Sequence, residues 1–96
     1  MRMLAIAQID VEAGNEAVRS GAMRQLMDRI MSRLQPEAAY FGPLDGVRTM
    51  FLVFDLDDPS RIPSMMEPFF DGLKAKVQLT PVMNREEVQA GLASIR

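Results

Sequence analysis

The chain has 96 residues, of which 48% are hydrophobic and 25% are charged, with a formal net charge of −2, so we expect one globular domain spanning residues 1–96. The chain has no Cys, His or Trp, which excludes disulfides, thiolate nucleophiles and the usual histidine bases, zinc ligands and haem ligands. It has no basic tract, no apolar run of about 20 residues and too short an N-terminal apolar run for a signal peptide. We therefore expect a soluble cytoplasmic protein that binds neither nucleic acid nor membrane.

Residues 3–11, "MLAIAQIDV", form a short apolar run that predicts the first strand. Both of its faces are mostly apolar, so we expect both to be covered. The small side chains of Ala5 and Ala7 favour close approach of a helix on one face, which leaves Gln8 and Asp10 on the other.

Residues 16–34 carry apolar side chains at helical spacing and predict the main helix. Asn15 is the expected N-cap, Gly21 is a weak point inside the helix, and Pro36 ends it.

Residues 37–56 predict a β-hairpin whose turn lies in "PLDG". The second arm is apolar on both faces, and a chain of this length has helices enough to cover only one of them. This pattern indicates a homodimer.

The stretch "PSMMEPFFDG" belongs to a predicted second helix, capped by Asp57 or Asp58. Pro68 lies deep inside that helix and is expected to kink or break it. The kink would leave Phe69 or Phe70 near the mouth of a pocket, although core packing accounts for both residues as well.

Residues 74–82 predict a last strand, with Pro81 at its end or at a sheet edge. "NREE", residues 84–87, has the pattern of a capping box and predicts a short C-terminal helix.

The predicted order is β-α-β-β-α-β with a short C-terminal helix, which is the ferredoxin-like α+β order. Two helices would cover one face of a four-stranded antiparallel sheet and leave the other face bare. A bare apolar face of that size indicates an interface or a ligand site, and we expect homodimerisation through the sheet faces.

The order, the length and the bare face resemble those of the dimeric α+β barrel superfamily. Within it, "FGPLDGVRTMFLVFDLDDPSRIP" and "VQLTPVMNREEVQAGL" are similar to small bacterial proteins of a domain-of-unknown-function family, over roughly residues 36–93. The resemblance implies a fold and no particular activity, because the superfamily includes cofactor-free monooxygenases, muconolactone-isomerase-like enzymes, polyketide cyclases and haem-using oxidases. The members that bind haem generally use His, and the monooxygenases often use Trp or His. This chain has neither residue, so no catalytic residue is carried over.

Polar residues on the strands are the candidates for a site. Gln8, Asp10, Gln78 and Thr80 either line a pocket or make hydrogen bonds in an interface. Tyr40, the only tyrosine, either presents its hydroxyl to a pocket or packs in the core or dimer seam. Arg48 either clamps a carboxylate or lies exposed at the end of a strand.

Asp55, Asp57 and Asp58 form an acidic cluster without the spacing of a calcium-binding loop, and helix capping explains them better than a metal does. We expect no metal and no cofactor.

These patterns favour a non-catalytic or accessory homodimer that binds a small apolar ligand between sheet and helices. Its candidate ligand-binding residues are Gln8, Tyr40, Phe69, Arg48 and Gln78. The alternative is a cofactor-independent monooxygenase, isomerase or cyclase acting on an aromatic or polyketide-like substrate, with Asp10 and Tyr40 as its acid–base candidates.

Overall fold

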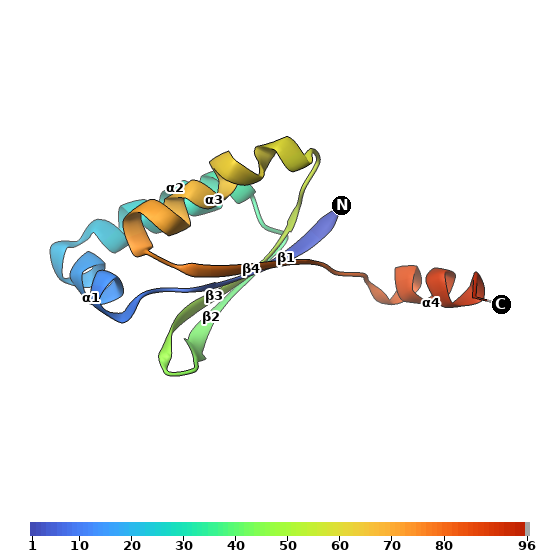
Figure 1. Cartoon of the computed structure of the whole chain (residues 1–96), viewed down its shortest axis with the longest axis horizontal. Helices are drawn as coiled ribbons and strands as arrows, with labels where there is room; N and C mark the ends of the chain where they lie inside the picture. Colours follow the sequence, from blue (N-terminus) through green and yellow to red (C-terminus); the bar gives the residue numbers. More distant parts are fainter. Residues whose placement is uncertain (96) are drawn as a thin grey trace.

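The computed structural model describes residues 1–95 and has an α+β architecture with one four-stranded antiparallel sheet and four α-helices (Figure 1). Its strands lie in the order β2-β3-β1-β4, and α1, α2 and α3 cover one face of the sheet. None of the helices within residues 1–95 has the length and apolar character that a membrane crossing requires. The elements are β1 (Arg2–Gln8), α1 (Val11–Ser20), α2 (Ala22–Leu34), β2 (Ala38–Leu44), β3 (Val47–Asp55), the 3-10 turn η1 (Pro59–Arg61), α3 (Ile62–Leu73), β4 (Lys76–Pro81) and α4 (Arg85–Ala93).

The two central strands alternate between a buried and a partly exposed face. Ala5 and Ala7 of β1 are buried under the helices, as predicted, and Leu4, Ile6 and Gln8 point to the other side. On β3 the alternation places Met50, Leu52 and Phe54 in the core. The core is completed from the helices by Ile30, Leu34, Met65, Met66, Phe69 and Leu73.

The predicted main helix is two helices, and it begins earlier than expected. β1 ends at Gln8, and Asp10 caps α1 by accepting a hydrogen bond from the backbone N–H of Ala13 at 2.9 Å. Asn15, expected as the cap, lies inside α1. Gly21 has a φ of 84°, a left-handed conformation that ends α1 and turns the chain into α2.

The hairpin matches its predicted residues closely. β2 and β3 pair from Leu44 opposite Val47, so the loop is only Asp45 and Gly46. Their φ angles are 56° and 78°, the left-handed pair that a two-residue type I′ turn requires.

Pro68 does not break α3, so of the two outcomes that the sequence predicted there, a kink or a break, the break is wrong. The helix runs from Ile62 to Leu73 with Pro68 buried inside it. Pro68 lacks the N–H that would bond the Ser64 carbonyl. That carbonyl instead accepts a hydrogen bond from Nη1 of Arg33, on α2, at 2.6 Å. The neighbouring helix therefore supplies the donor that the proline removes. At the start of this segment Asp58 is the residue that caps η1.

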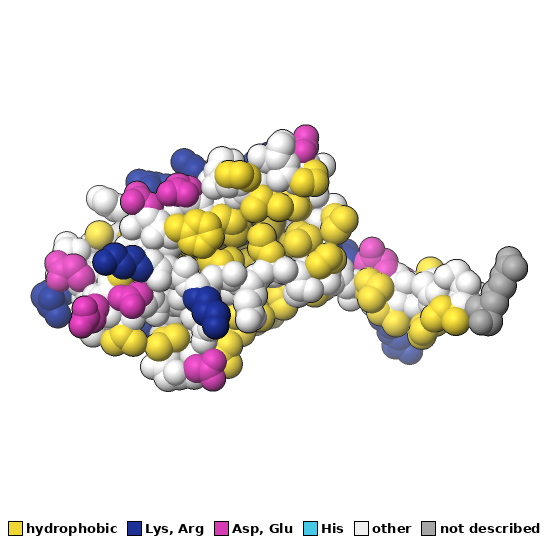
Figure 2. Space-filling model, in the orientation of Figure 1, with side chains coloured by type: hydrophobic (Ala, Val, Ile, Leu, Met, Phe, Trp, Pro, Cys, Tyr) yellow, Lys and Arg dark blue, Asp and Glu magenta, His cyan; other side chains and the backbone are white. Residues whose placement is uncertain are grey.

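α4 extends beyond the end of the sheet, near the start of β1 (Figure 1). It begins with the predicted capping box, in which Asn84 and Glu87 each accept a hydrogen bond from the other's backbone N–H. No α4 residue within 85–93 is buried, and Val88 and Leu92 are exposed. Figure 2 shows hydrophobic side chains along α4 and along the seam between α3 and β4, where Phe70 is half-exposed.

Candidate ligand-binding cleft

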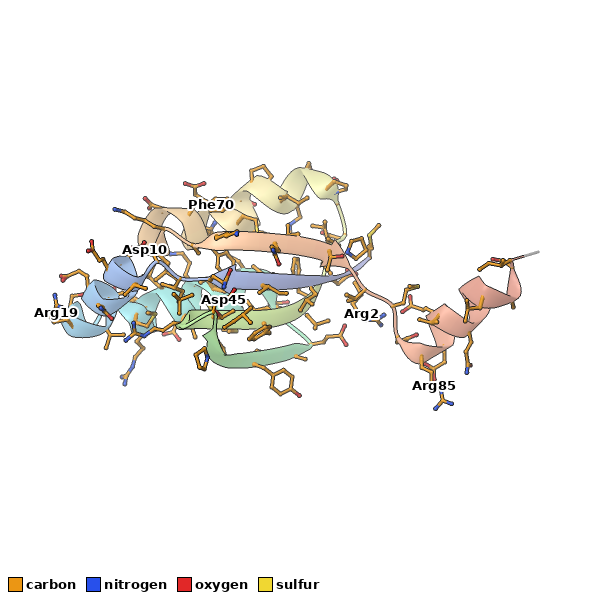
Figure 3. All side chains as sticks on the ribbon, turned by 60° about the horizontal axis from the view of Figure 1, so that its bottom comes forward. Arg2, Asp10, Arg19, Asp45, Phe70 and Arg85 are labelled. Carbon is orange, nitrogen blue, oxygen red and sulfur yellow. The ribbon has the colours of Figure 1, made fainter. Side chains whose placement is uncertain are left out.

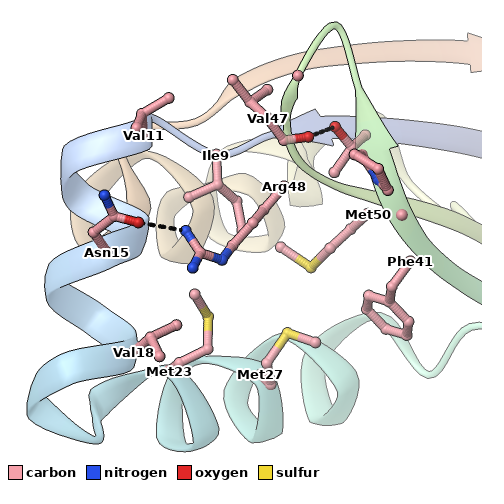
Figure 4. Close-up of a pocket in the computed structure, with 14 residues that line it drawn as sticks. Ile9, Val11, Asn15, Val18, Met23, Met27, Phe41, Val47, Arg48 and Met50 are labelled. Atoms are coloured by element: carbon pink, nitrogen blue, oxygen red, sulfur yellow. Dashed lines mark hydrogen bonds between the residues drawn. The ribbon is translucent and has the colours of Figure 1, made fainter.

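A cleft of about 660 Å³ lies between the helices and the hairpin end of the sheet. α1 and α2 form one wall, and β2, β3 and the residues after β1 form the other (Figure 4). Most of its lining is apolar, including Ile9, Met23, Met27, Phe41 and Met50. An apolar cleft of this volume is in the range of small-molecule sites.

Arg48 is an exposed residue near the start of β3, as one of its two predicted roles had it, and it brings a positive charge to this apolar cleft. Its side chain reaches from β3 toward α1, where Nη1 donates a hydrogen bond to Oδ1 of Asn15 at 2.8 Å (Figure 4). Gly14 leaves room for this approach, because a Cβ there would lie 3.2 Å from Nη1 of Arg48 and 3.1 Å from Cγ2 of Ile9. The ion pairs formed within residues 1–95 involve the N-terminal amine, Arg2, Arg19 and Arg61, and none involves Arg48.

Of the other polar candidates, Gln8, Tyr40, Gln78 and Thr80 lie on the face of the sheet that the helices do not cover, whereas Asp10 follows β1. Strand pairing places Tyr40 opposite Phe51, and Gln78 opposite Ile6, on that face. Tyr40 is 71% exposed. Gln8 reaches across the sheet to the hairpin turn, where its Nε2 donates to the carbonyl of Leu44 and to Oδ2 of Asp45, both at 3.2 Å.

Gln8 and Asp10 both line a second, more open hollow of about 390 Å³, whose other lining residues are the charged Asp45, Lys74 and Lys76 and the apolar Ile9, Val11 and Val47. Gln78 and Thr80 do not line it, so the predicted polar cluster is brought together only in part. Asp10, Asp45 and Arg19 lie toward one end of the molecule, and Arg2 lies at the opposite end of the sheet, between the sheet and α4 (Figure 3).

Asp10 and Phe69, two further candidates, both have a role in holding the fold together. The carboxylate of Asp10 caps α1. Phe69 is 0% exposed and packs in the core, whereas Phe70 is the residue at the surface. A role for Phe69 in ligand binding stays a prediction.

The three aspartates that follow β3 each have a separate partner. Asp55 pairs with the N-terminal amine, Asp57 with Arg61, and Asp58 caps η1. The hydrogen bond from Arg61 lowers the pKa of Asp57, and the bond from the backbone N–H of Ser60 lowers the pKa of Asp58. Within residues 1–95 no three Asp or Glu side chains converge in a way that could hold a metal ion.

The sequence reading missed most of the cleft lining. Met23 and Met27 lie in the predicted main helix, Asn15 is its expected cap and Phe41 lies in the predicted hairpin, but none of the four is a predicted site residue. The spacing of Met23 and Met27, one helical turn apart, was available in the sequence. The spacing of apolar residues did not predict that the helix breaks at Gly21. This break sets where α2 starts beside the hairpin.

No protein-family model matches this chain, and no curated protein matches its sequence. The resemblance of residues 36–93 to a domain-of-unknown-function family of the dimeric α+β barrel superfamily therefore stays a prediction.

Proposed function

We propose that the protein is a small homodimeric binding protein that holds an apolar ligand between its sheet and its helices. The observation that carries this proposal is the apolar cleft of about 660 Å³ between α1, α2 and the hairpin. Met23, Met27 and Met50 give it a lining that adapts to ligands of different shape, since methionine is flexible and polarizable.

The subunit in this proposal is ferredoxin-like and pairs through the uncovered face of its sheet. The strand order β2-β3-β1-β4, antiparallel throughout, with helices on one face, supports the ferredoxin-like assignment. Leu4, Ile6, Phe51 and Val53 lie together on the uncovered face and are only partly exposed.

The sheet face would supply about half of the area that a stable pairing needs. Four strands of about seven residues span about 23 by 19 Å, or roughly 440 Å² in projection. A stable interface buries about 800 Å² per partner. The exposed apolar side chains of α4, such as Leu92, would add to the sheet face in a dimer.

The ligand site is tested by NMR of the protein with ¹³C-labelled methionine methyl groups, titrated with 1-naphthamide as an uncharged apolar probe. The methyl signals of Met23, Met27 and Met50 should shift, while those of Met65 and Met66 in the core should not. Absence of any shift at the three cleft methionines, at probe concentrations up to its solubility limit, would contradict the proposal.

A pair of matched variants locates the site. Val18 is an exposed residue of the cleft wall, and Val88 is an exposed residue of α4. Val18→Trp should fill the cleft and abolish the naphthamide shifts, and Val88→Trp should leave them unchanged. Equal effects of the two substitutions would argue against binding in the cleft.

The alternative function is a cofactor-independent monooxygenase, isomerase or cyclase. Its proposed base, Asp10, is engaged in capping α1, and Tyr40 lies on the opposite side of the sheet from the cleft. A general acid or base must reach the substrate to act. The arrangement therefore supports ligand binding better than catalysis.

A further inference from the structure

The one charged group in the cleft decides which apolar ligands fit best. Of the residues that line the cleft, all within residues 1–95, only Arg48 is charged. We propose that the ligand is a small organic carboxylate with an aromatic or branched apolar body, whose carboxylate pairs with Arg48. This inference rests on the proposed ligand-binding function and names the class of ligand.

The guanidinium of Arg48 is held in place and keeps donors to spare. Asn15 accepts one hydrogen bond from Nη1 with a neutral amide oxygen, at 2.8 Å. A guanidinium has five N–H donors in a planar fork that matches the two oxygens of a carboxylate. Asn15 therefore acts as a positioning residue that fixes the fork from the α1 side and leaves donors for a ligand.

No ion pair among residues 1–95 neutralises this charge. Two carboxylates at this end of the molecule have other partners: Asp10 accepts from the N–H of Ala13, and Asp45 accepts from Gln8. Neither forms an ion pair with Arg48, as far as residues 1–95 are concerned. An organic anion would supply an opposite charge, and the planar fork of the exposed guanidinium would hold a carboxylate through two parallel hydrogen bonds.

The rest of the wall selects the body of the ligand. Met23, Met27, Met50 and Phe41 surround the hollow beside the guanidinium (Figure 4). Thioethers and aromatic rings make favourable contacts with the faces and edges of an aromatic ligand. The wall has few polar groups apart from Arg48, Asn15 and Thr49, and the hydroxyl of Thr49 already donates to the carbonyl of Val47. A heavily hydroxylated ligand such as a sugar would leave its hydroxyls unpaired there.

The test compares two probes of the same shape, 1-naphthoate and 1-naphthamide, which differ in the charge of one group. Both are titrated into the full chain with labelled methionine methyls. Both should shift Met23, Met27 and Met50, and naphthoate should bind at least tenfold more tightly, a difference of about 1.4 kcal/mol. Naphthoate affinity should fall with added salt and naphthamide affinity should not.

Four substitutions test whether the guanidinium of Arg48 causes the preference for naphthoate over naphthamide. Arg48→Met should remove the preference for naphthoate and leave naphthamide binding intact, and Arg48→Lys should keep only part of the preference because it loses the fork. Asn15→Ala should weaken naphthoate binding alone. Arg24→Met, which removes the same charge from α2 outside this cleft, is the control and should change neither affinity. Unchanged Met65 and Met66 signals verify that each variant is folded.

The outcomes separate the two proposals. Equal affinities for the two probes, or a naphthoate preference that survives Arg48→Met, would overturn the anion inference and leave the apolar cleft standing. Failure of both probes to shift the three cleft methionines would overturn the proposed function and this inference with it.

Discussion

Arg33 and Pro68 show how a residue that breaks helices is accommodated by a second helix. The proline removes a donor from α3, and the arginine of α2 donates to the Ser64 carbonyl in its place. This hydrogen bond ties the two helices together at the carbonyl that the proline leaves without its helical partner.

This account predicts that the two residues are energetically coupled. Arg33→Met should lower the free energy of unfolding by about 0.5–1 kcal/mol, because the Ser64 carbonyl loses its partner. In a Pro68→Ala background the N–H of residue 68 can bond that carbonyl, so the same Arg33→Met change should cost close to nothing. Urea unfolding of the four proteins of this double-mutant cycle, at one protein concentration, measures the coupling.

The control is Arg29→Met, which removes the same charge from the same helix, one turn earlier. It should have the same small effect with and without Pro68. An Arg33→Met penalty of equal size in both backgrounds would mean that the hydrogen bond to Ser64 contributes nothing specific to Pro68.

At the scale of elements, α4 differs from the other α-helices because none of its residues 85–93 is buried, and an ion pair joins it to β1. Arg2, at the start of β1, pairs with Glu87 of α4 and with Glu37 before β2. The backbone N–H of Val82 bonds the carbonyl of Arg2 at 3.1 Å. The bond from the backbone N–H of Asn84, and after it the bond from Arg2, lower the pKa of Glu87 below its ordinary value of 4.5.

The lowered pKa predicts that acid unravels α4 first. Because the pKa of Glu87 is lower in the folded state, its stabilisation of α4 is fully present above pH 4.5 and is lost as the pH falls through the folded value. The ¹³Cα secondary shifts of residues 85–88 should therefore decline in this acid range while those of Ile30 in the core persist. An NMR titration from pH 7 to about pH 3 follows both.

Two substitutions assign this transition. Glu87→Gln retains an acceptor for Asn84 but does not titrate, so the acid transition of α4 should be lost. Glu86→Gln, beside it in the first turn, should keep the transition. A transition that survives Glu87→Gln would have to come from another group.

The helices and strands show which parts of this fold can be predicted from the sequence. The faces of β1 and the Asp45–Gly46 turn follow from short-range rules, namely alternation and positive φ, and both were predicted. The start of α1 was missed because Asp10 completed an apolar run and read as a strand residue. The cleft was not predicted because its walls come from segments that are far apart in the sequence, namely α1, α2 and the hairpin. Among its lining residues, only Arg48 was a predicted site residue.

At the scale of the whole molecule, the chain is longer than a compact domain of its size. Its extents are 55 × 28 × 17 Å and its radius of gyration is 15.2 Å. A compact domain of 96 residues would have a radius of about 12.5 Å. α4 accounts for the difference, and together with the uncovered sheet face it leaves apolar side chains without a cover in the single chain.

The proposed pairing through the sheet predicts a sharp effect of one substitution. Ile6 lies on the central strand β1, opposite Phe51 of β3, near the middle of the uncovered face. The wild-type chain should sediment with twice the mass of one chain. Ile6→Lys would place charges in the seam and should raise the dimer dissociation constant at least a hundredfold, as measured by sedimentation equilibrium.

Phe70→Lys is the matched control, since Phe70 is 48% exposed on the helical side of the molecule. It should leave the dimer intact. The opposite pattern, with dissociation by Phe70→Lys and none by Ile6→Lys, would move the interface to the seam between α3 and β4. A monomeric wild-type chain would contradict pairing altogether.

The two outer strands carry residues that stop the sheet from growing sideways. Pro43 interrupts the donors of β2, Pro81 ends β4, and Lys76 places a charge at the beginning of β4. β2 and β4 are the edges of the sheet, and edges of this kind resist adding a strand from another molecule. Association through the broad face closes after two copies, whereas edge-to-edge addition has no natural end. If the proposed pairing holds, we therefore expect the uncovered apolar face to be consumed in a closed dimer, while the two edges resist the strand addition that leads to fibrils.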